Sequence, residues 1–195
     1  MKQIVYLGGL GDDRGDLSEH LRSRAETAAA LATGSVPVTT LRAAVVVGRG
    51  SAGFETIVAL VERLPAMVAP KWISSPTQPI ALADIVRYLA EVAGRPEAIG
   101  ESFDVGGPEV MTYRQMMERI GVLRGRRPWI VEVPVLTPRL SSLWLHLVTP
   151  VGASVARPLI EGLKSPTIAR EERLRTLVPF ELTSFDVAAR SALEG

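Results

Sequence analysis

Short apolar runs and helical spacings alternate over the first fifty residues. Residues 4–7 form an apolar run that is typical of a strand buried on both faces of a parallel sheet. Apolar residues then recur at helical spacing, namely Leu17, Leu21, Ala25, Ala28 and Ala32. Asp16 and Glu19 fit a capping box at the start of this helix. Residues 38–47 predict a second strand, which ends at residues 48–51, so strand, helix and strand predict one parallel, right-handed crossover unit.

Helices and strands alternate less regularly after residue 50. The predicted helices span residues 54–63, 82–93, 112–123 and 183–193. Thr112 and Gln115 fit a capping box, and Thr183 is the predicted cap of the last helix. Strands are predicted at 103–105 and 129–135, an extended polar segment at 72–80, and helices in broken pieces at 136–163. The pattern predicts an α/β fold.

Composition narrows the possible function classes. A chain of 195 residues is long enough for one domain, or one domain and an appendage. The net charge is +1 and no long run of lysine or arginine occurs, which argues against nucleic-acid binding. The chain has no cysteine and only two histidines, which are far apart in sequence. We therefore expect no disulfide and no metal site.

The apolar segments do not predict secretion or a membrane span. The apolar run at residues 4–7 is too short for a signal peptide and leads directly into glycines, so we expect a cytoplasmic protein. Residues 136–155 are rather apolar, but Pro138, Arg139, His146 and Pro150 interrupt them. For this segment, peripheral membrane contact is the alternative left open.

His20 and Arg24 are the first candidate site residues. They lie one helical turn apart on one helix face, just beyond the carboxyl end of the first strand. Ligands bind at this place in open α/β folds. Three interpretations remain: exposed residues on an amphipathic helix, cofactor contacts, or a proton-transfer pair.

Other candidates have a simpler explanation in each case. The loop at residues 8–11 is rich in glycine, but Asp12 and Asp13 follow and would repel a pyrophosphate, so a tight turn is favoured over a phosphate cradle. The tryptophans are more typical of core than of a pocket; they are Trp72, Trp129 and Trp144. An exposed helix face is favoured over an anion site for three other residues, Arg139, His146 and Arg157.

Five segments together resemble one family of enzymes. They are residues 4–11, 20–26, 41–48, 78–80 with 84–85, and 103–108, with the sequences IVYLGGLG, HLRSRAE, LRAAVVVG, QPI with DI, and FDVGGP. The chain is similar to the atypical short-chain dehydrogenase/reductases, in particular to the NAD(P)-binding, NmrA-like group related to the nucleotide-binding accessory subunit of respiratory complex I. The resemblance covers almost the whole chain but only the C-terminal half of the family's fold. It implies a truncated chain without the phosphate-binding turn.

The resemblance assigns roles to particular residues. Where catalytic members have a serine, this chain has Gly8 or Gly9, and where they have a tyrosine and a lysine, it has His20 and Arg24. The implied catalytic residues are His20 and Arg24. Arginine keeps its charge and can bind ribose hydroxyls and phosphate, whereas a nearby positive charge favours a neutral imidazole that is a poor acid. The implied cofactor-binding residues are Gly8, Gly9, Arg24, Ala44, Val45 and Val46.

Two of these assignments have an equal structural alternative. Residues 43–48 pass beside the nicotinamide in the family, but a plain buried strand explains them as well. Residues 78–80 and Asp84 resemble the segment that closes the substrate pocket, but Asp84 is equally well placed to cap a helix.

The implied fold is the C-terminal half of a Rossmann-like, doubly wound parallel sheet with a smaller mixed region on the substrate side. Residues 1–50 would form a partial strand-helix-strand unit, and residues 51–195 the remaining elements. The implied function is that of an NAD(P)-binding oxidoreductase with NAD or NADP as cofactor and a small, apolar ligand. The alternative is a non-catalytic nucleotide-binding, redox-sensing or scaffold protein. A sheet cut through its middle leaves a free strand edge, so we also expect self-association through residues 4–7.

Overall fold

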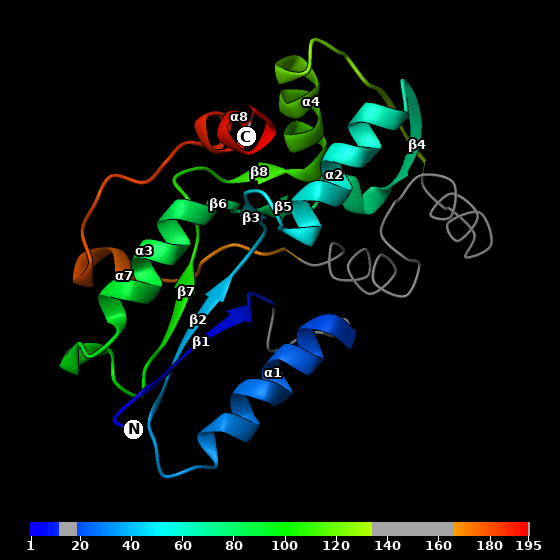
Figure 1. Cartoon of the computed structure of the whole chain (residues 1–195). Helices are drawn as coiled ribbons and strands as arrows, with labels where there is room; N and C mark the ends of the chain where they lie inside the picture. The colour runs from blue at the N-terminus through cyan, green and yellow to red at the C-terminus, as the bar shows by residue number, and fades with distance from the viewer. Residues whose placement is uncertain (12–18, 134–165, 195) are drawn as a thin grey trace.

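The computed structural model describes residues 1–11, 19–133 and 166–194 (Figure 1). Its centre is a parallel sheet of three strands in the order β1 (Ile4–Gly9), β2 (Val38–Ala43) and β7 (Ser102–Val105). Helix α1 (Glu19–Ala32) connects β1 to β2. The predicted parallel strand-helix-strand unit is therefore confirmed. The predicted boundary at residue 50 stays a prediction, and the sheet takes β7 from beyond it.

The two faces of β1 contact different helices. Val5 and Leu7 pack against the apolar cluster that includes Ile85 and Tyr88 of α3 (Leu82–Val92). On the other face, the hydroxyl of Tyr6 donates to the backbone oxygen of Arg24 in α1, at 3.3 Å. Helices α1 and α3 accordingly lie on opposite sides of the sheet (Figure 1).

The prediction that β1 is buried on both faces is wrong. All six of its residues are only half-buried, and α1 contributes no buried residue at all. The apolar sequence of β1 is typical of a central strand, but within the described residues β1 pairs with β2 alone and lies at the edge of the sheet.

The prediction of one strand over residues 38–47 is also wrong. Strand β2 ends at Ala43, and the chain bends at residues 44–45 before a separate strand, β3 (Val46–Val47), begins. Strand β3 pairs in parallel with β6 (Ile80–Ala81), and the backbone N–H of Ile80 donates to the oxygen of Val45 at 3.0 Å. We call residues 44–45 the β2–β3 bend. The bend exists because the two halves of the predicted strand have different partners: β2 pairs with β1 and β7, and β3 pairs with β6.

The remaining elements surround this sheet. They are α2 (Ala52–Arg63), β4 (Ala66–Pro70), the 3-10 helix η1 (Lys71–Ser74), β5 (Pro76–Thr77), the 3-10 helix η2 (Pro96–Ala98), β8 (Met111–Thr112), α4 (Tyr113–Leu123), β9 (Trp129–Val133), α7 (Arg173–Leu177) and α8 (Phe185–Glu194). Strands β4 and β9 pair in parallel, and β5 and β8 pair in antiparallel. Helices α2, α3 and α4 confirm three predicted helices, and β7 and β9 confirm two predicted strands.

Helix starts show both a confirmed and a wrong prediction. At α4, the hydroxyl of Thr112 accepts from the Gln115 N–H at 3.2 Å and the Gln115 side chain accepts from the Thr112 N–H at 2.7 Å, which confirms the capping box. Thr183 does not cap α8. Its N–H and its hydroxyl donate to the two carboxylate oxygens of buried Asp84, at 2.7 and 2.9 Å. Because this partner occupies Asp84, the explanation of Asp84 as a helix cap is wrong too.

The segment at residues 72–80 is less extended and more buried than predicted. It contains the end of η1 and the strand β5, and the side chains of Trp72 and Ile73 are buried. Strand β4, just before it, was not predicted. Both features depend on distant partners, because β4 pairs with β9 and β5 pairs with β8.

Two apolar clusters form the core. One lies between the three-stranded sheet, α3 and the C-terminal residues 174–182, and the other between α2, α4 and α8. The register pair Arg42 and Asp104 ties β2 to β7, with an Nη2 to Oδ1 distance of 2.6 Å. The second oxygen of Asp104 accepts from the N–H of Arg170 at 3.2 Å, so this buried carboxylate also holds the C-terminal segment.

Several predictions lie outside the described residues. They concern the capping box at Asp16, the helical pieces at 136–163 with their possible membrane contact, and Trp144, Arg139, His146 and Arg157. Within the described part of the chain, no helix is long and apolar enough to cross a membrane. The same residues contain no group of three or more potential metal ligands.

Gly107 provides a test of the packing between β6 and the loop after β7. A Cβ at Gly107 would lie 2.2 Å from the backbone oxygen of Pro79, where a side-chain atom cannot fit. We expect Gly107→Ala to lower the free energy of unfolding in urea by about 2 kcal/mol or more. Gly53→Ala is the matched control, because Gly53 is helical and has open space around it; it should raise stability by about 0.5–1 kcal/mol. Equal effects of the two changes would contradict this packing.

The outer edge of β1 pairs with no strand of the described residues, which makes it a testable site of self-association. The N–H of Ile4 donates to the Pro37 oxygen, so in a strand the N–H of the next residue, Val5, points away from β2. We expect sedimentation velocity to show dimers that increase with concentration. Val5→Pro should abolish them without removing a bond of the β1–β2 ladder, because proline lacks only an edge N–H there. A wild-type chain that stays monomeric over the tested concentrations would refute the prediction.

Candidate functional site

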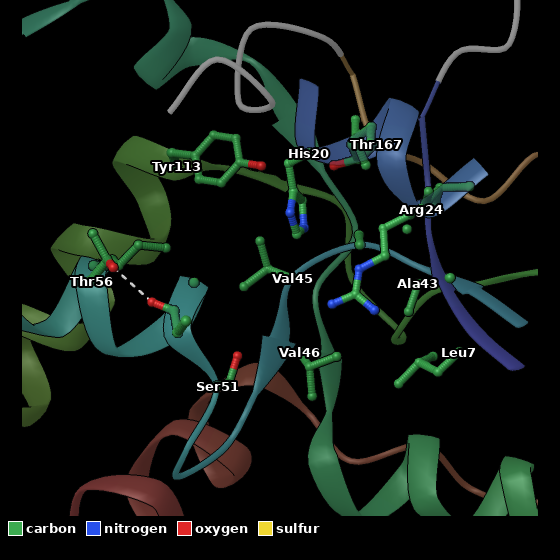
Figure 2. A pocket seen from close by; sticks show the side chains of 18 of the residues that line it. Leu7, His20, Arg24, Ala43, Val45, Val46, Ser51, Thr56, Tyr113 and Thr167 are labelled. Carbon is green, nitrogen blue, oxygen red and sulfur yellow. Dashed lines mark hydrogen bonds between the residues drawn. The ribbon is translucent and has the colours of Figure 1, made fainter. Parts of the chain in front are cut away.

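A pocket of about 320 Å³ lies at the carboxyl ends of β1 and β2. One wall comes from α1, the floor from the β2–β3 bend, and the opposite wall from α2 and α4 (Figure 2). This position, outside the ends of parallel strands, is where ligands bind in open α/β sheets. The pocket is therefore the candidate functional site of the described chain.

The structure brings the sequence-predicted site residues together around this pocket. All of them contribute to its lining, namely Gly8, Gly9, His20, Arg24, Ala44, Val45 and Val46. They come from one strand, the helix that follows it and the bend after the next strand. Their shared location supports the predicted grouping, while their catalytic and cofactor-binding roles stay predictions.

The two glycines allow α1 to approach the end of β1 closely. A Cβ at Gly9 would lie 2.7 Å from Cδ2 of Leu21, whereas one at Gly8 would make its shortest contact at 3.4 Å, to Cε1 of Tyr6. A side chain at Gly9 would push the helix away from the strand. The glycine requirement at this position is thus explained by close packing. The predicted tight turn does not begin at Gly8, because β1 continues through Gly8 and Gly9.

His20 lies in the pocket as a neutral imidazole. Its pKa is lowered from 6.5, first by burial and second by the positive charge of Arg24. The predicted direction is confirmed, although burial is the larger cause. At neutral pH this side chain can donate or accept a hydrogen bond, but it holds no surplus proton for an acid-catalysed step.

Arg24 presents its charge to the pocket. Figure 2 shows its side chain extending from α1 toward the side of the pocket where Val45 and Val46 lie. Its guanidinium forms no hydrogen bond or ion pair with any residue that the structure describes. An arginine that lines a concave site and has no partner among the described residues is suited to an anionic or hydroxyl-rich ligand.

The wall formed by α2 and α4 was not predicted from the sequence. Its apolar side chains include Ile57 and Leu60 of α2, Met117 of α4 and Trp72 of η1. The apolar stripes of α2 and α4 predicted that these helices bury one face. They gave no sign that part of each face would border a cavity, because this depends on how the two helices pack against each other.

Polar groups in this wall are few. The hydroxyl of Thr56 donates to the Ala52 oxygen at 2.7 Å and is thus engaged within α2. Ser51 precedes α2 without capping it through its side chain. Tyr113 and Thr167 also line the pocket, and Figure 2 shows the Tyr113 hydroxyl pointing from α4 toward the side of His20 and Thr167.

The segment expected to close the pocket lies elsewhere. Gln78 donates to the Gly107 oxygen at 2.8 Å and accepts from the Ala169 N–H at 3.0 Å, so it joins three backbone segments. Asp84 is bonded to Thr183, as described above. Neither residue lines the pocket, because both are held by chain segments that are remote in sequence. Among the tryptophans, Trp72 is both core and pocket wall, whereas Trp129 is 72% exposed.

Comparison with known proteins gives a match in structure only. The sequence matches no protein-family model and no curated protein sequence. An NADPH-dependent quinone oxidoreductase of Escherichia coli, solved with NADPH, matches with a TM-score of 0.72 and 15% identity, over 95% of this chain and 64% of that one. The triphenylmethane reductase of Citrobacter sp. with NADP(H) matches with a TM-score of 0.67 and 16% identity, over 98% and 65%. A nucleoside-diphosphate-sugar epimerase of Staphylococcus aureus matches with a TM-score of 0.66 and 14% identity, over 97% and 65%.

The chain has the fold of these oxidoreductases and of this epimerase. This similarity extends over nearly the whole chain and confirms the predicted α/β, Rossmann-like class with parallel strands. The chain spans about 65% of the length of these structures. The matches do not support the narrower predictions of a C-terminal half and of kinship with the complex I subunit.

The pKa of His20 provides a direct test of the pocket's electrostatics. NMR titration in a His146→Gln background, which leaves one histidine signal, should give a pKa below 6.5. Arg24→Gln should raise this pKa only part of the way toward 6.5, because burial remains, and Arg22→Gln should leave it unchanged.

The same pKa predicts how stability depends on pH. Above pH 6.5, His20 adds no pH dependence to the free energy of unfolding. Below pH 6.5, the unfolded chain binds the proton of His20 before the folded chain does. The free energy of unfolding therefore decreases with falling pH until the pKa of His20 in the folded chain is passed. A folded pKa at or above 6.5 would contradict the pocket's geometry.

Proposed function

We propose that the chain is an NAD(P)-binding protein of the atypical short-chain dehydrogenase/reductase type. In this proposal the pocket holds the nicotinamide end of NAD or NADP beside β1 and β2, and a small apolar ligand against α2 and α4. The observation that carries it is the division of one pocket into a cationic wall and an apolar wall. The proteins of similar fold include two that were solved with NADPH or NADP(H).

The residues present fit the nicotinamide end of a dinucleotide. Arg24 would bind ribose hydroxyls or phosphate with its guanidinium, which has no partner among the described residues. The β2–β3 bend would lie along the nicotinamide, where the side chains of Ala44 and Val45 leave apolar surface. Gly8 adds no side chain to this part of the lining. The chemistry that the dinucleotide supplies when bound is hydride transfer.

One observation favours a second candidate function. Carbonyl reduction requires a proton donor, and the position that carries the catalytic tyrosine in the resembling family has His20, whose pKa is lowered. Arg24 stands at the position of the catalytic lysine and cannot lose its proton in a protein. These two residues are better suited to binding than to acid catalysis. The second candidate is therefore a non-catalytic protein that binds the dinucleotide as a redox sensor or as part of an assembly.

Binding of reduced nicotinamide mononucleotide tests the proposal. This probe contains the part of the dinucleotide that the pocket is proposed to hold. Arg24→Ala should weaken its binding by about 10-fold or more, the value of one hydrogen bond to a charged group, and Arg24→Lys by less. Arg22→Ala is the matched control, because Arg22 is an exposed arginine of the same helix that does not line the pocket.

The measurement is isothermal titration calorimetry, with thermal unfolding to verify that each variant folds. Equal affinities of the wild type and Arg24→Ala would refute the proposed site. Turnover of NADPH with an apolar carbonyl compound, lost in both His20→Ala and Arg24→Ala, would refute the non-catalytic candidate and retain the binding proposal.

A further inference from the structure

The apolar wall of the pocket contains one concentrated polar feature. The hydroxyls of Tyr113, Thr77 and Thr167 lie together, and the three residues are 1%, 0% and 6% exposed. The Thr167 hydroxyl donates to that of Thr77 at 2.8 Å, and both lie within hydrogen-bonding reach of the Tyr113 hydroxyl. We call these three groups the hydroxyl cluster. Two of its members, Tyr113 and Thr167, line the pocket directly.

Backbone hydrogen bonds fix the cluster from three parts of the chain. Thr77 belongs to β5, which pairs with β8 on one side. On its other side Thr77 forms a bridge with Thr167, with bonds of 2.9 Å from Gln78 N–H to Thr167 oxygen and 3.1 Å from Thr167 N–H to Pro76 oxygen. The hydroxyls are therefore held in place before any ligand arrives. Preorganised polar groups of this kind orient ligands in apolar pockets.

The ring of Tyr113 is also held in place. Tyr113 is the first residue of α4, directly after the N-cap Thr112, and its ring meets the ring of Trp72 edge-on, with centroids 6.1 Å apart and an interplanar angle of 78°. Edge-to-face contact is a preferred geometry for two aromatic rings. The direction of the hydroxyl is thus set by the helix start at one end of the side chain and by the two threonines at the other.

Counting protons shows which hydrogen bond the cluster can offer. Each hydroxyl donates one proton and accepts up to two hydrogen bonds. The proton of Thr167 is used on Thr77, and the proton of Thr77 can go to the oxygen of Tyr113. The proton of the Tyr113 phenol is then the one that has no acceptor within the cluster, so it can be donated to a ligand. Burial raises the pKa of Tyr113, so the phenol keeps this proton and stays a donor.

We propose that the Tyr113 hydroxyl anchors the ligand by donating a hydrogen bond to an uncharged oxygen, as in a ketone or another carbonyl compound. The body of the molecule lies against Trp72, Ile57 and Met117. A charged carboxylate does not fit this end of the pocket, because no cation there compensates for the loss of hydration among the described residues. This inference rests on the proposed function only in taking the pocket as a ligand site, and it requires no bound dinucleotide.

Two probes of nearly identical shape isolate the proposed hydrogen bond. They are 2-acetylnaphthalene, a ketone, and 2-isopropenylnaphthalene, in which a CH₂ group replaces the carbonyl oxygen. We expect the wild-type chain to bind the ketone about 5-fold more tightly than the hydrocarbon, as one neutral hydrogen bond gives. Tyr113→Phe should remove this preference while changing the affinity for the hydrocarbon by less than about 2-fold. The measurement is an NMR or calorimetric titration without dinucleotide.

Tyr88→Phe is the matched control, because Tyr88 is an equally buried tyrosine in the other core cluster and does not line the pocket. It should keep the full preference for the ketone. Thr167→Val, which removes one hydroxyl but keeps the tyrosine, should reduce the preference and provides a second test if Tyr113→Phe fails to fold.

Three outcomes would overturn the inference. Equal binding of the two probes by the wild type would mean that the cluster only satisfies its own hydrogen bonds. A preference that Tyr113→Phe retains would exclude the phenol as the anchor. A preference that Ser51→Ala removes would transfer the anchor to the pocket's half-exposed serine. Loss of nicotinamide mononucleotide binding with an intact preference for the ketone would refute the proposed function alone.

Discussion

The β2–β3 bend is the constraint on which the site depends. Up to Ala43, the chain hydrogen-bonds within the three-stranded sheet; from Val46 on, it pairs with β6 instead. This change of partner directs the chain from the sheet toward α2, so that α1 and α2 lie on opposite sides of a gap instead of packing together. The bend is held at both ends, by the bond from Leu10 N–H to the Ala43 oxygen and by the bond from Ile80 N–H to the Val45 oxygen. A straight strand over residues 38–47 would leave no floor for the pocket.

Local rules were sufficient wherever the partners of a residue are close in sequence. The capping box at Thr112 and the helical spacing of α2 and α3 involve neighbours within a few residues, and both were predicted. The bend could not be predicted, because its cause is that β2 pairs with β1 and β7 whereas β3 pairs with β6. Thr183 could not be predicted for the same reason. Threonine is a common helix cap, but here its hydroxyl donates to a carboxylate 99 positions away.

The candidate site also has a part that depends on local sequence and a part that depends on distant segments. His20 and Arg24 were found because one strand-helix unit places them, and the spacing of residues within a helix determines their common face. The opposite wall takes residues from η1, α2, α4 and the segment at Thr167, and only the folded chain shows that they meet. The sequence therefore identified the wall that carries His20 and Arg24, which the proposed function assigns to the dinucleotide. The sequence did not reveal the apolar wall and the hydroxyl cluster, which are proposed to hold the second ligand.

Helix α1 has a consequence for the motions of the site. Every other α-helix of the described chain buries at least one residue, whereas α1 buries none. Its alanines stabilise it through helix propensity, and its attachment to the sheet is shallow. Backbone amides in such a helix open to solvent at a lower free-energy cost than those in a helix with a buried face. His20 and Arg24 are thus carried on the pocket's most easily opened wall, and a ligand that bridges α1 and the β2–β3 bend would slow amide exchange in α1 more than anywhere else in the fold.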